Sequence, residues 1–199
     1  MNITVYLGAT PGNDPALEKA VRALGAWIGE NGHDLVYGGS RCGLMGMLAE
    51  SVLKAGGKVT GVEPKFFVDA GFVYDAITKL YVTNDMSERK AKMIELGDAF
   101  IAFPGGTGTL EEIAEVMSKV ALGHLDAPCI LYDLNGYYTG MKILLDQMLS
   151  AELSTPCSKT GACMNCKSPD TICCQFLITR FSRHKDRIHV ILVNDTLGF

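Results

Sequence analysis

The sequence predicts an α/β protein, a doubly wound parallel sheet covered by helices on both faces. Over the first 150 residues, short β-rich runs alternate with stretches of helical periodicity, an alternation that is typical of parallel sheets. Several runs, such as Ala99–Phe103, are apolar throughout, as strands buried on both faces are. Ligands of such folds bind beyond the carboxyl ends of the strands. The loops that follow the strands are therefore the expected place for functional residues.

The individual elements follow from the spacing of apolar residues. Apolar residues between Leu17 and Ile28 recur at spacings of three and four positions, which predicts one apolar face of an amphipathic helix. The same spacing recurs over 45–52, 110–121 and 137–148. The predicted strands cover Ile3–Leu7, Asp34–Tyr37, Lys58–Val62, Lys79–Thr83, Ala99–Phe103 and Pro128–Tyr132. The pattern of Arg187–Asn194 is consistent with a further strand.

Composition and charge exclude several functional classes. The formal net charge is −4, so the chain lacks the basic footprint of a nucleic-acid-binding protein. A local site for a small anion remains compatible with that charge. No segment approaches the roughly 18 apolar residues of a membrane span. The N-terminus begins directly as a strand without the pattern of a secretion signal, so we expect a cytoplasmic protein.

The strongest local pattern is a glycine-rich loop between a strand and a helix, Pro104-Gly105-Gly106-Thr107-Gly108-Thr109-Leu110-Glu111-Glu112. Glycines let the backbone approach a ligand closely, and the free N–H groups at a helix start favour an anion such as phosphate. An alternative stays open for two of these residues. Thr109 and Glu112 also fit a capping box, in which both serve only the helix start.

Two other patterns follow predicted strands. Gly38–Gly46 contains glycines at 38, 39, 43 and 46, a spacing that fits neither the dinucleotide fingerprint nor a P-loop. A tight turn with close helix packing would also explain it. Asp85–Lys92 opens a helix with a capping-box pattern and carries Arg89 and Lys90. By pattern alone these two cations would lie on a solvated helix face, but the first turns of this helix sit at the ligand edge of the sheet.

The order and separation of the three patterns resemble the LONELY GUY family, long labelled "lysine decarboxylase-like". The resemblance rests on Gly38 to Gly46, on Met86-x-x-Arg89-Lys90 and on Pro104 to Glu112, over roughly residues 1–150. It implies a Rossmann-like, three-layer α/β/α fold and usually a dimer. It implies a phosphoribohydrolase that splits a cytokinin-type or adenosine 5′-monophosphate into free base and ribose 5-phosphate, with no cofactor and no metal.

The resemblance also assigns roles to residues. Arg89 and Glu112 correspond to the family's catalytic pair. Residues expected to contact the substrate are Gly39, Met86, Lys90, Gly105, Gly106, Thr107, Gly108, Thr109, Leu110, Glu111 and Ser118, and Asp69 is a candidate for an acidic residue before the fourth strand. We expect Glu112 to stabilise an oxocarbenium-like sugar or orient water. Arg89 would act as an electrostatic stabiliser, because its guanidinium does not lose a proton.

Residues 154–199 depart from the family, whose members normally end in a short helical segment. We therefore divide the chain into a catalytic domain over 1–153 and an atypical tail over 154–199 that is not an independent domain. Five cysteines, Cys157, Cys163, Cys166, Cys173 and Cys174, crowd into this tail. A zinc site is one alternative, although a second matching pair is missing. A shifted reading frame or an accreted segment is another, and we expect catalysis not to need the tail.

Two other functions compete with the hydrolase. A non-catalytic carrier or sensor of the same fold would bind a nucleotide or the molybdenum cofactor and keep the glycine loops, but it would not need Glu112. A decarboxylase would require pyridoxal phosphate on a lysine, and no lysine here stands in a context that suggests a Schiff base.

Overall fold

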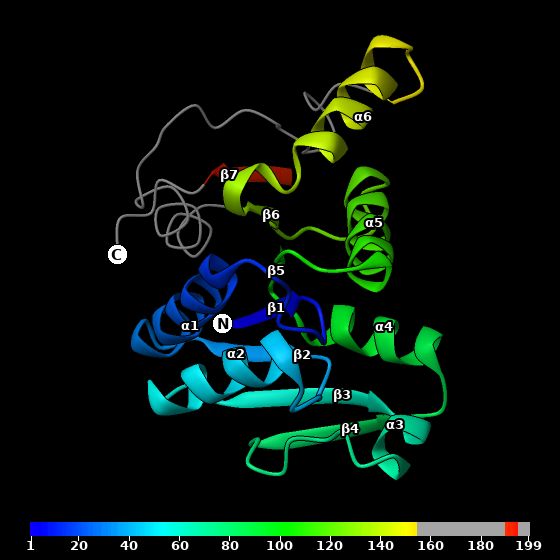
Figure 1. Ribbon diagram of the computed structural model, residues 1–199. Coiled ribbons are helices and arrows are strands. Elements are labelled where there is room, and N and C mark those ends of the chain that lie inside the picture. The colour runs from blue at the N-terminus through cyan, green and yellow to red at the C-terminus, as the bar shows by residue number, and fades with distance from the viewer. Residues whose placement is uncertain (155–189, 195–199) are drawn as a thin grey trace.

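A computed structural model describes residues 1–154 and 190–194, which form a three-layer α/β/α fold around one parallel sheet (Figure 1). The strand order is β4-β3-β2-β1-β5-β6-β7, and every paired neighbour runs parallel. The strands are β1 (Asn2–Tyr6), β2 (Asp34–Tyr37), β3 (Val59–Pro64), β4 (Lys79–Thr83), β5 (Ala99–Ala102), β6 (Cys129–Asp133) and β7 (Val190–Asn194). The predicted fold class is confirmed, and the predicted strands are present with small shifts at their ends.

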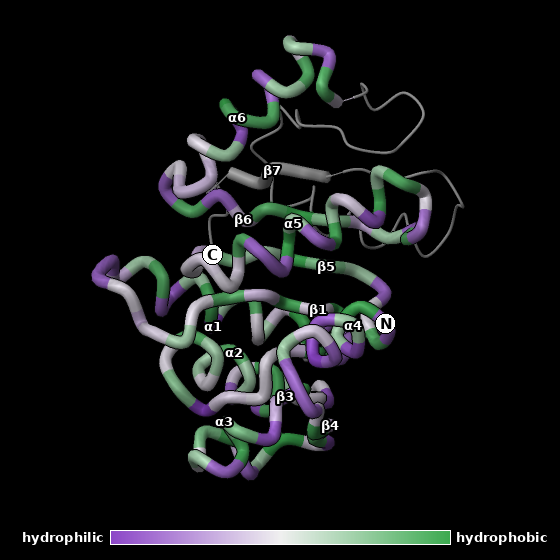
Figure 2. The backbone as a smooth tube through the Cα atoms, turned by 90° about the vertical axis from the view of Figure 1, so that its right-hand side faces the viewer, coloured by the Kyte–Doolittle hydropathy of each residue, from purple (hydrophilic) through white to green (hydrophobic). Residues whose placement is uncertain are grey.

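Helices cover both faces of the sheet, and the sheet divides the hydrophobic core into two halves. On one face lie α1 (Pro15–Glu30) and α2 (Gly43–Lys54), with side chains such as Leu48 and Val52 packed on the sheet. On the other lie α4 (Met86–Leu96) and α5 (Thr107–Ala121), with Met93 and Ile113 in the second half of the core. Figure 2 shows that the strands β5 and β6 between these layers are predominantly hydrophobic.

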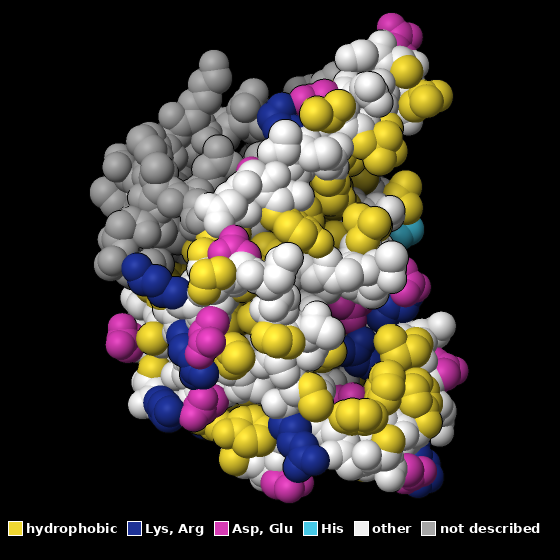
Figure 3. All heavy atoms as spheres, viewed as in Figure 1, with side chains coloured by type: hydrophobic (Ala, Val, Ile, Leu, Met, Phe, Trp, Pro, Cys, Tyr) yellow, Lys and Arg dark blue, Asp and Glu magenta, His cyan; other side chains and the backbone are white. Residues whose placement is uncertain are grey.

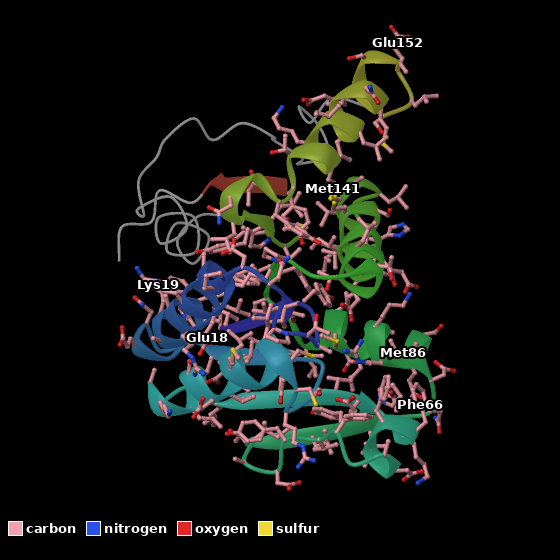
Figure 4. The ribbon with its side chains drawn as sticks, viewed as in Figure 1. Glu18, Lys19, Phe66, Met86, Met141 and Glu152 are labelled. Carbon is pink, nitrogen blue, oxygen red and sulfur yellow. The ribbon has the colours of Figure 1, made fainter. Side chains whose placement is uncertain are left out.

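Two further helices lie at the edges of this arrangement. The short α3 (Lys65–Asp69), which the periodicity did not indicate, follows β3 directly. The helix α6 (Thr139–Ser150) extends away from the sheet and has no buried residue (Figure 1). Its Met141 packs against the second half of the core (Figure 4). No helix in the described part of the chain is long and apolar enough to cross a membrane.

The sheet topology places the ligand edge between β1 and β5, where the strand order reverses. Open α/β sheets bind ligands at such a switch point. The loops after these two strands touch, because a Cβ on Gly105 would lie only 2.9 Å from the backbone nitrogen of Gly8. The glycine-rich loop after β5 is therefore held at the crevice that the fold creates.

The tail contributes one described element. Within the expected strand at Arg187–Asn194, residues Val190–Asn194 form β7 and extend the sheet beside β6. The five cysteines of the tail lie outside the described residues, and so does the zinc alternative that depends on them. The division of the chain at residue 153 stays a prediction.

Candidate active site

The centre of the candidate site is an ion pair between α4 and α5. Arg89 Nη1 donates to Glu112 Oε1 at 2.6 Å, and the two residues are 8% and 7% exposed. Burying two charges costs free energy that only good pairing geometry offsets. The structure thus brings together the two residues that the family resemblance assigns to catalysis.

Arg89 is fixed from three sides. Besides the bond to Glu112, its Nε donates to the carbonyl of Val62 at 3.0 Å. A Cβ on Gly38 would lie 2.3 Å from its Nη2, so only a glycine allows the guanidinium to lie there. The helix begins with Asp85 as N-cap, whose Oδ1 accepts from Glu88 N at 2.8 Å, and this start directs Arg89 toward the sheet. The alternative of a solvated helix face is wrong for Arg89.

Glu112 lies more than one turn inside α5 and takes no part in its N-cap. The helix begins at Thr107 after Gly106, and no described side chain caps it. The capping-box alternative for Thr109 and Glu112 is therefore wrong. Burial raises the pKa of the Glu112 carboxyl, while the guanidinium of Arg89 opposes this shift by favouring the ionised form.

The start of α5 is suited to binding an anion. Its first N–H groups lack a side-chain cap among the described residues, and the positive end of the helix dipole lies there. A Cβ added to Gly106 or Gly108 would meet nothing within 4 Å, so the space over this turn is open. Tyr137 Oη donates to the carbonyl of Gly105 and so fixes the loop to the segment before α6. The predicted positions 105–109 thus form an open turn, with Thr109 buried beneath it.

Lys90 lies beside the pair and contacts acidic residues of α5. Its Nζ is 2.6 Å from Glu111 Oε1 and 3.3 Å from Glu115 Oε2. The hydrogen bond with Glu111 is the main cause that raises the pKa of Lys90 above its ordinary value. Its amine is therefore held in the charged form, which can attract a phosphate but cannot attack a carbonyl carbon.

The remaining expected contacts lie farther from this centre or are already engaged. Met86 and Leu110 are partly exposed at the starts of α4 and α5, and Met86 lies at the same edge of the molecule as Phe66 (Figure 4). Ser118 donates its hydroxyl to the carbonyl of Ala114. Asp69, at the end of α3, forms an exposed ion pair with Lys65 at 2.8 Å. The structure does not bring Ser118 or Asp69 to the Arg89–Glu112 pair.

Glu63 is a second buried carboxyl at this edge and was not among the residues expected there. It is 3% exposed near the end of β3. Gly39, which was expected to contact the substrate, has a φ of +90°, and a Cβ there would lie 2.4 Å from Glu63 Oε2. A sequence signal existed, because Glu63 is the one charged residue within the strand Val59–Pro64.

Comparisons with known proteins agree with this arrangement. A family model described as "Possible lysine decarboxylase" matches residues 45–175. The chain is 40% identical over 160 residues to the cytokinin riboside 5′-monophosphate phosphoribohydrolase of Rhodococcoides fascians, covering 80% of this chain and 81% of that protein. It is 36% identical over 157 residues to the cytokinin riboside 5′-monophosphate phosphoribohydrolase LOG1 of Arabidopsis thaliana, covering 79% and 74% of the two chains.

Solved structures share the fold. The molybdenum cofactor binding protein of the phototrophic bacterium Rippkaea orientalis is similar with a TM-score of 0.57 and 28% identity, over 76% of this chain and 83% of that chain. The molybdenum cofactor carrier protein of Chlamydomonas reinhardtii has a TM-score of 0.56 at 20% identity, over 75% and 85% of the chains. The second likeness shows the fold alone.

Proposed function

Because the chain belongs to the LONELY GUY family, the group covered by the lysine decarboxylase-like model, we propose that it hydrolyses purine nucleoside 5′-monophosphates. Water adds a hydroxyl to the ribose C1′, the N-glycosidic bond breaks, and the base leaves with a proton. The products are free base and ribose 5-phosphate. The observation that carries this proposal is the buried Arg89–Glu112 pair beside an uncapped helix start.

Glu112 supplies the negative charge that the reaction needs. Cleavage of a glycosidic bond passes through an oxocarbenium-like sugar, and a carboxylate fixed nearby stabilises that positive charge without reorganising. The bond to Arg89 uses Oε1 of Glu112 and leaves Oε2 outside the ion pair. That second oxygen can face the sugar or orient the attacking water.

Arg89 acts as a fixed positive charge. Its bonds to Val62 and Glu112 hold the guanidinium in one orientation, and a guanidinium stays protonated throughout the accessible pH range. It stabilises the negative charge that develops on the departing base and favours the ionised form of Glu112. Arg89 therefore does not act as a general acid.

The start of α5 and Lys90 hold the 5′-phosphate. The open turn over Gly106 and Gly108 provides backbone N–H groups, and the charged amine of Lys90 adds a cation on a neighbouring helix. A lysine decarboxylase would instead need a neutral amine to form a Schiff base with pyridoxal phosphate. The ion pairs of Lys90 with Glu111 and Glu115 oppose that chemistry.

We also propose that the enzyme is a homodimer. Exposed apolar side chains occur on α6 and on the elements beside it, and Figure 3 shows hydrophobic side chains gathered over this part of the molecule. They include Leu122, Tyr137, Ile143 and Leu144, each more than half exposed. A second copy would cover this surface, and sedimentation of the protein with Ile143→Glu and Leu144→Glu tests it. A cytoplasmic location stays a prediction.

The decisive experiment measures release of free base and ribose 5-phosphate from AMP and from isopentenyladenosine monophosphate. Wild type is compared with Glu112→Gln and with the control Glu95→Gln, an exposed glutamate that pairs with Lys92. We expect cleavage by wild type and by the control, and a loss of at least about 100-fold in Glu112→Gln, as for removal of one fixed electrostatic stabiliser. The ratio of the two substrate rates gives the base preference.

The competing function is a carrier or sensor, and the likeness to the molybdenum cofactor binding protein of Rippkaea orientalis is the observation that favours it. Binding of both nucleotides without release of base from either would support that function and contradict the hydrolase. A requirement for pyridoxal phosphate, visible in an absorbance scan, would instead support the decarboxylase.

A further inference from the structure

Glu63 is a buried carboxyl that the proposed mechanism does not use. It is 3% exposed, and its Oε2 has no hydrogen-bond partner among the described residues. An unpaired buried polar group costs free energy, so a protein retains one chiefly where it serves another purpose. The hydroxyl of Tyr37, on the neighbouring strand β2, is buried without a partner as well. The two unpaired groups come from adjacent strands of the sheet.

The loop after β2 connects Glu63 to the Arg89–Glu112 pair. Two consecutive glycines each lie against one charged side chain: Gly38 against Arg89 Nη2 and Gly39 against Glu63 Oε2. A Cβ would approach these atoms to 2.3 Å and 2.4 Å, closer than any real contact allows. Arg89 also bonds to the carbonyl of Val62, the residue directly before Glu63. Glu63 therefore borders the same guanidinium that Glu112 pairs with.

We propose that Glu63 is a positioning residue of this site: its neutral carboxyl supports the glycine loop beside Arg89, and its ionisation weakens binding of the nucleotide's phosphate. The inference rests on the proposed function and extends it to the pH range in which the site accepts an anion. With Glu63 neutral, the charges of Arg89 and Glu112 cancel. With Glu63 ionised, the buried cluster carries one net negative charge, which repels an incoming anion.

The surroundings of Glu63 define its titration. The groups that face it are Arg89 from α4 and Tyr37 from β2, with Glu112 behind Arg89 and Tyr74 beside Tyr37. Burial raises the pKa of Glu63 to about 7, and Arg89 opposes the shift. The pKa values of Tyr37 and Glu112 are also raised by burial. Tyr37 therefore stays neutral near pH 7, and the charge of Glu63 changes there.

The test measures binding of ribose 5-phosphate, a reaction product that cannot be cleaved further at the glycosidic bond. Titration calorimetry at pH 6.5 and pH 8.5 compares wild type with Glu63→Gln, Glu63→Leu and the exposed control Glu95→Gln. If only the neutral form binds, a pKa of about 7 predicts Kd values weaker by up to about 25-fold at pH 8.5. We expect a weakening of at least about fivefold in wild type and in Glu95→Gln, and about twofold or less in both Glu63 variants.

A second readout is proton uptake on binding. At pH 7.5, wild type is expected to take up as much as about 0.8 proton, which shows as a dependence of the binding heat on the buffer's ionisation enthalpy. The phosphate group titrates equally in all variants, so the difference between wild type and Glu63→Gln isolates Glu63. If thermal melting shows that Glu63→Gln does not fold, wild type is compared with Glu63→Leu instead.

The outcomes separate this inference from the hydrolase proposal. The pH dependence of binding with no base released in a parallel assay supports the role of Glu63 and contradicts the hydrolase. Base release with equal pH dependence of binding in wild type and both Glu63 variants overturns the role of Glu63 and leaves the hydrolase intact. Failure of wild type to bind ribose 5-phosphate at pH 6.5 overturns the role of Glu63, and the base-release assay alone then decides the hydrolase.

Discussion

Arg89 Nη1 lies 2.6 Å from Glu112 Oε1, although the two residues are 23 positions apart and belong to different helices. The path of α4 explains this meeting. It starts after the edge strand β4 and packs against β3, β2 and β1, and α5 starts at the same carboxyl edge of the sheet, after β5. The first turn of α4 therefore lies against the second turn of α5, and Arg89 meets Glu112 there.

Replacing Arg89 by methionine should destabilise the fold in a pH-dependent way. The substitution leaves the buried carboxylate of Glu112 unpaired, which costs about 3–5 kcal/mol at pH 7.5. Burial then raises the pKa of Glu112 without opposition from Arg89. The folded variant binds an additional proton as the pH falls toward the unfolded value, so its deficit should shrink at pH 5. Urea unfolding at both pH values measures this, and an equal deficit at both would contradict it.

The paired substitution Arg89→Met with Glu112→Leu serves as the control. It removes both charges, and apolar side chains of similar volume often replace a buried ion pair without loss of stability. We expect the double variant to recover most of the free energy of unfolding and to release no base.

Gly39→Ala should destabilise the protein more than Gly56→Ala. Both glycines have a φ near +90°, but a Cβ at Gly56 would meet nothing within 4 Å, whereas one at Gly39 would lie 2.4 Å from Glu63 Oε2. The shared backbone strain costs about 1–2 kcal/mol, and crowding at Gly39 adds about 1–3 kcal/mol. Thermal unfolding of Gly39→Ala with and without Glu63→Ala measures the coupling. Zero coupling would show that Glu63 does not cause the excess.

Gly108→Ala should stabilise the fold and weaken phosphate binding. Alanine stabilises a helix by about 0.5–1 kcal/mol relative to glycine, and a Cβ at this position meets no protein atom within 4 Å. It would instead occupy the space proposed for the phosphate, so Kd for ribose 5-phosphate should rise about tenfold, or about 1.4 kcal/mol.

Gly140→Ala is the matched control for Gly108→Ala. Gly140 is likewise the second residue of its helix, α6, and has open space around it. It should give a similar gain in melting temperature with unchanged binding. Equal effects of both variants on Kd would argue against a phosphate site at the start of α5.

Glu63→Gln should change how stability depends on pH. The pKa of Glu63 is about 7 in the folded protein and ordinary for a glutamate in the unfolded chain. The folded state therefore binds more protons between these values, and wild-type stability falls as the pH rises through that window. Between pH 5 and pH 8 the wild type should lose about 2 kcal/mol more than Glu63→Gln. If the stability of both proteins depended on pH in the same way, Glu63 would not be the group that titrates in this range.

The sequence alone determined the fold class, the six strands within residues 1–153 and the positions of the glycine loops. These features depend on local signals: apolar runs for buried strands, helical spacing for amphipathic faces, and glycines where a strand turns into a helix. The family resemblance added Arg89 and Glu112 as a pair. The N-cap at Asp85 was also readable, because its bond to Glu88 N spans three residues.

Only the tertiary structure decided which polar residues meet. By local pattern Glu112 fits a helix cap and Arg89 a solvated face, and Asp69 is the candidate for the additional acidic residue. The fold instead buried Arg89 with Glu112, left Asp69 exposed with Lys65, and placed Glu63 against Gly39. The physical reason is that a side chain's charge partner depends on strand order and on the crossing of helices. Those contacts join residues that are far apart in the chain, so no local sequence pattern predicts them.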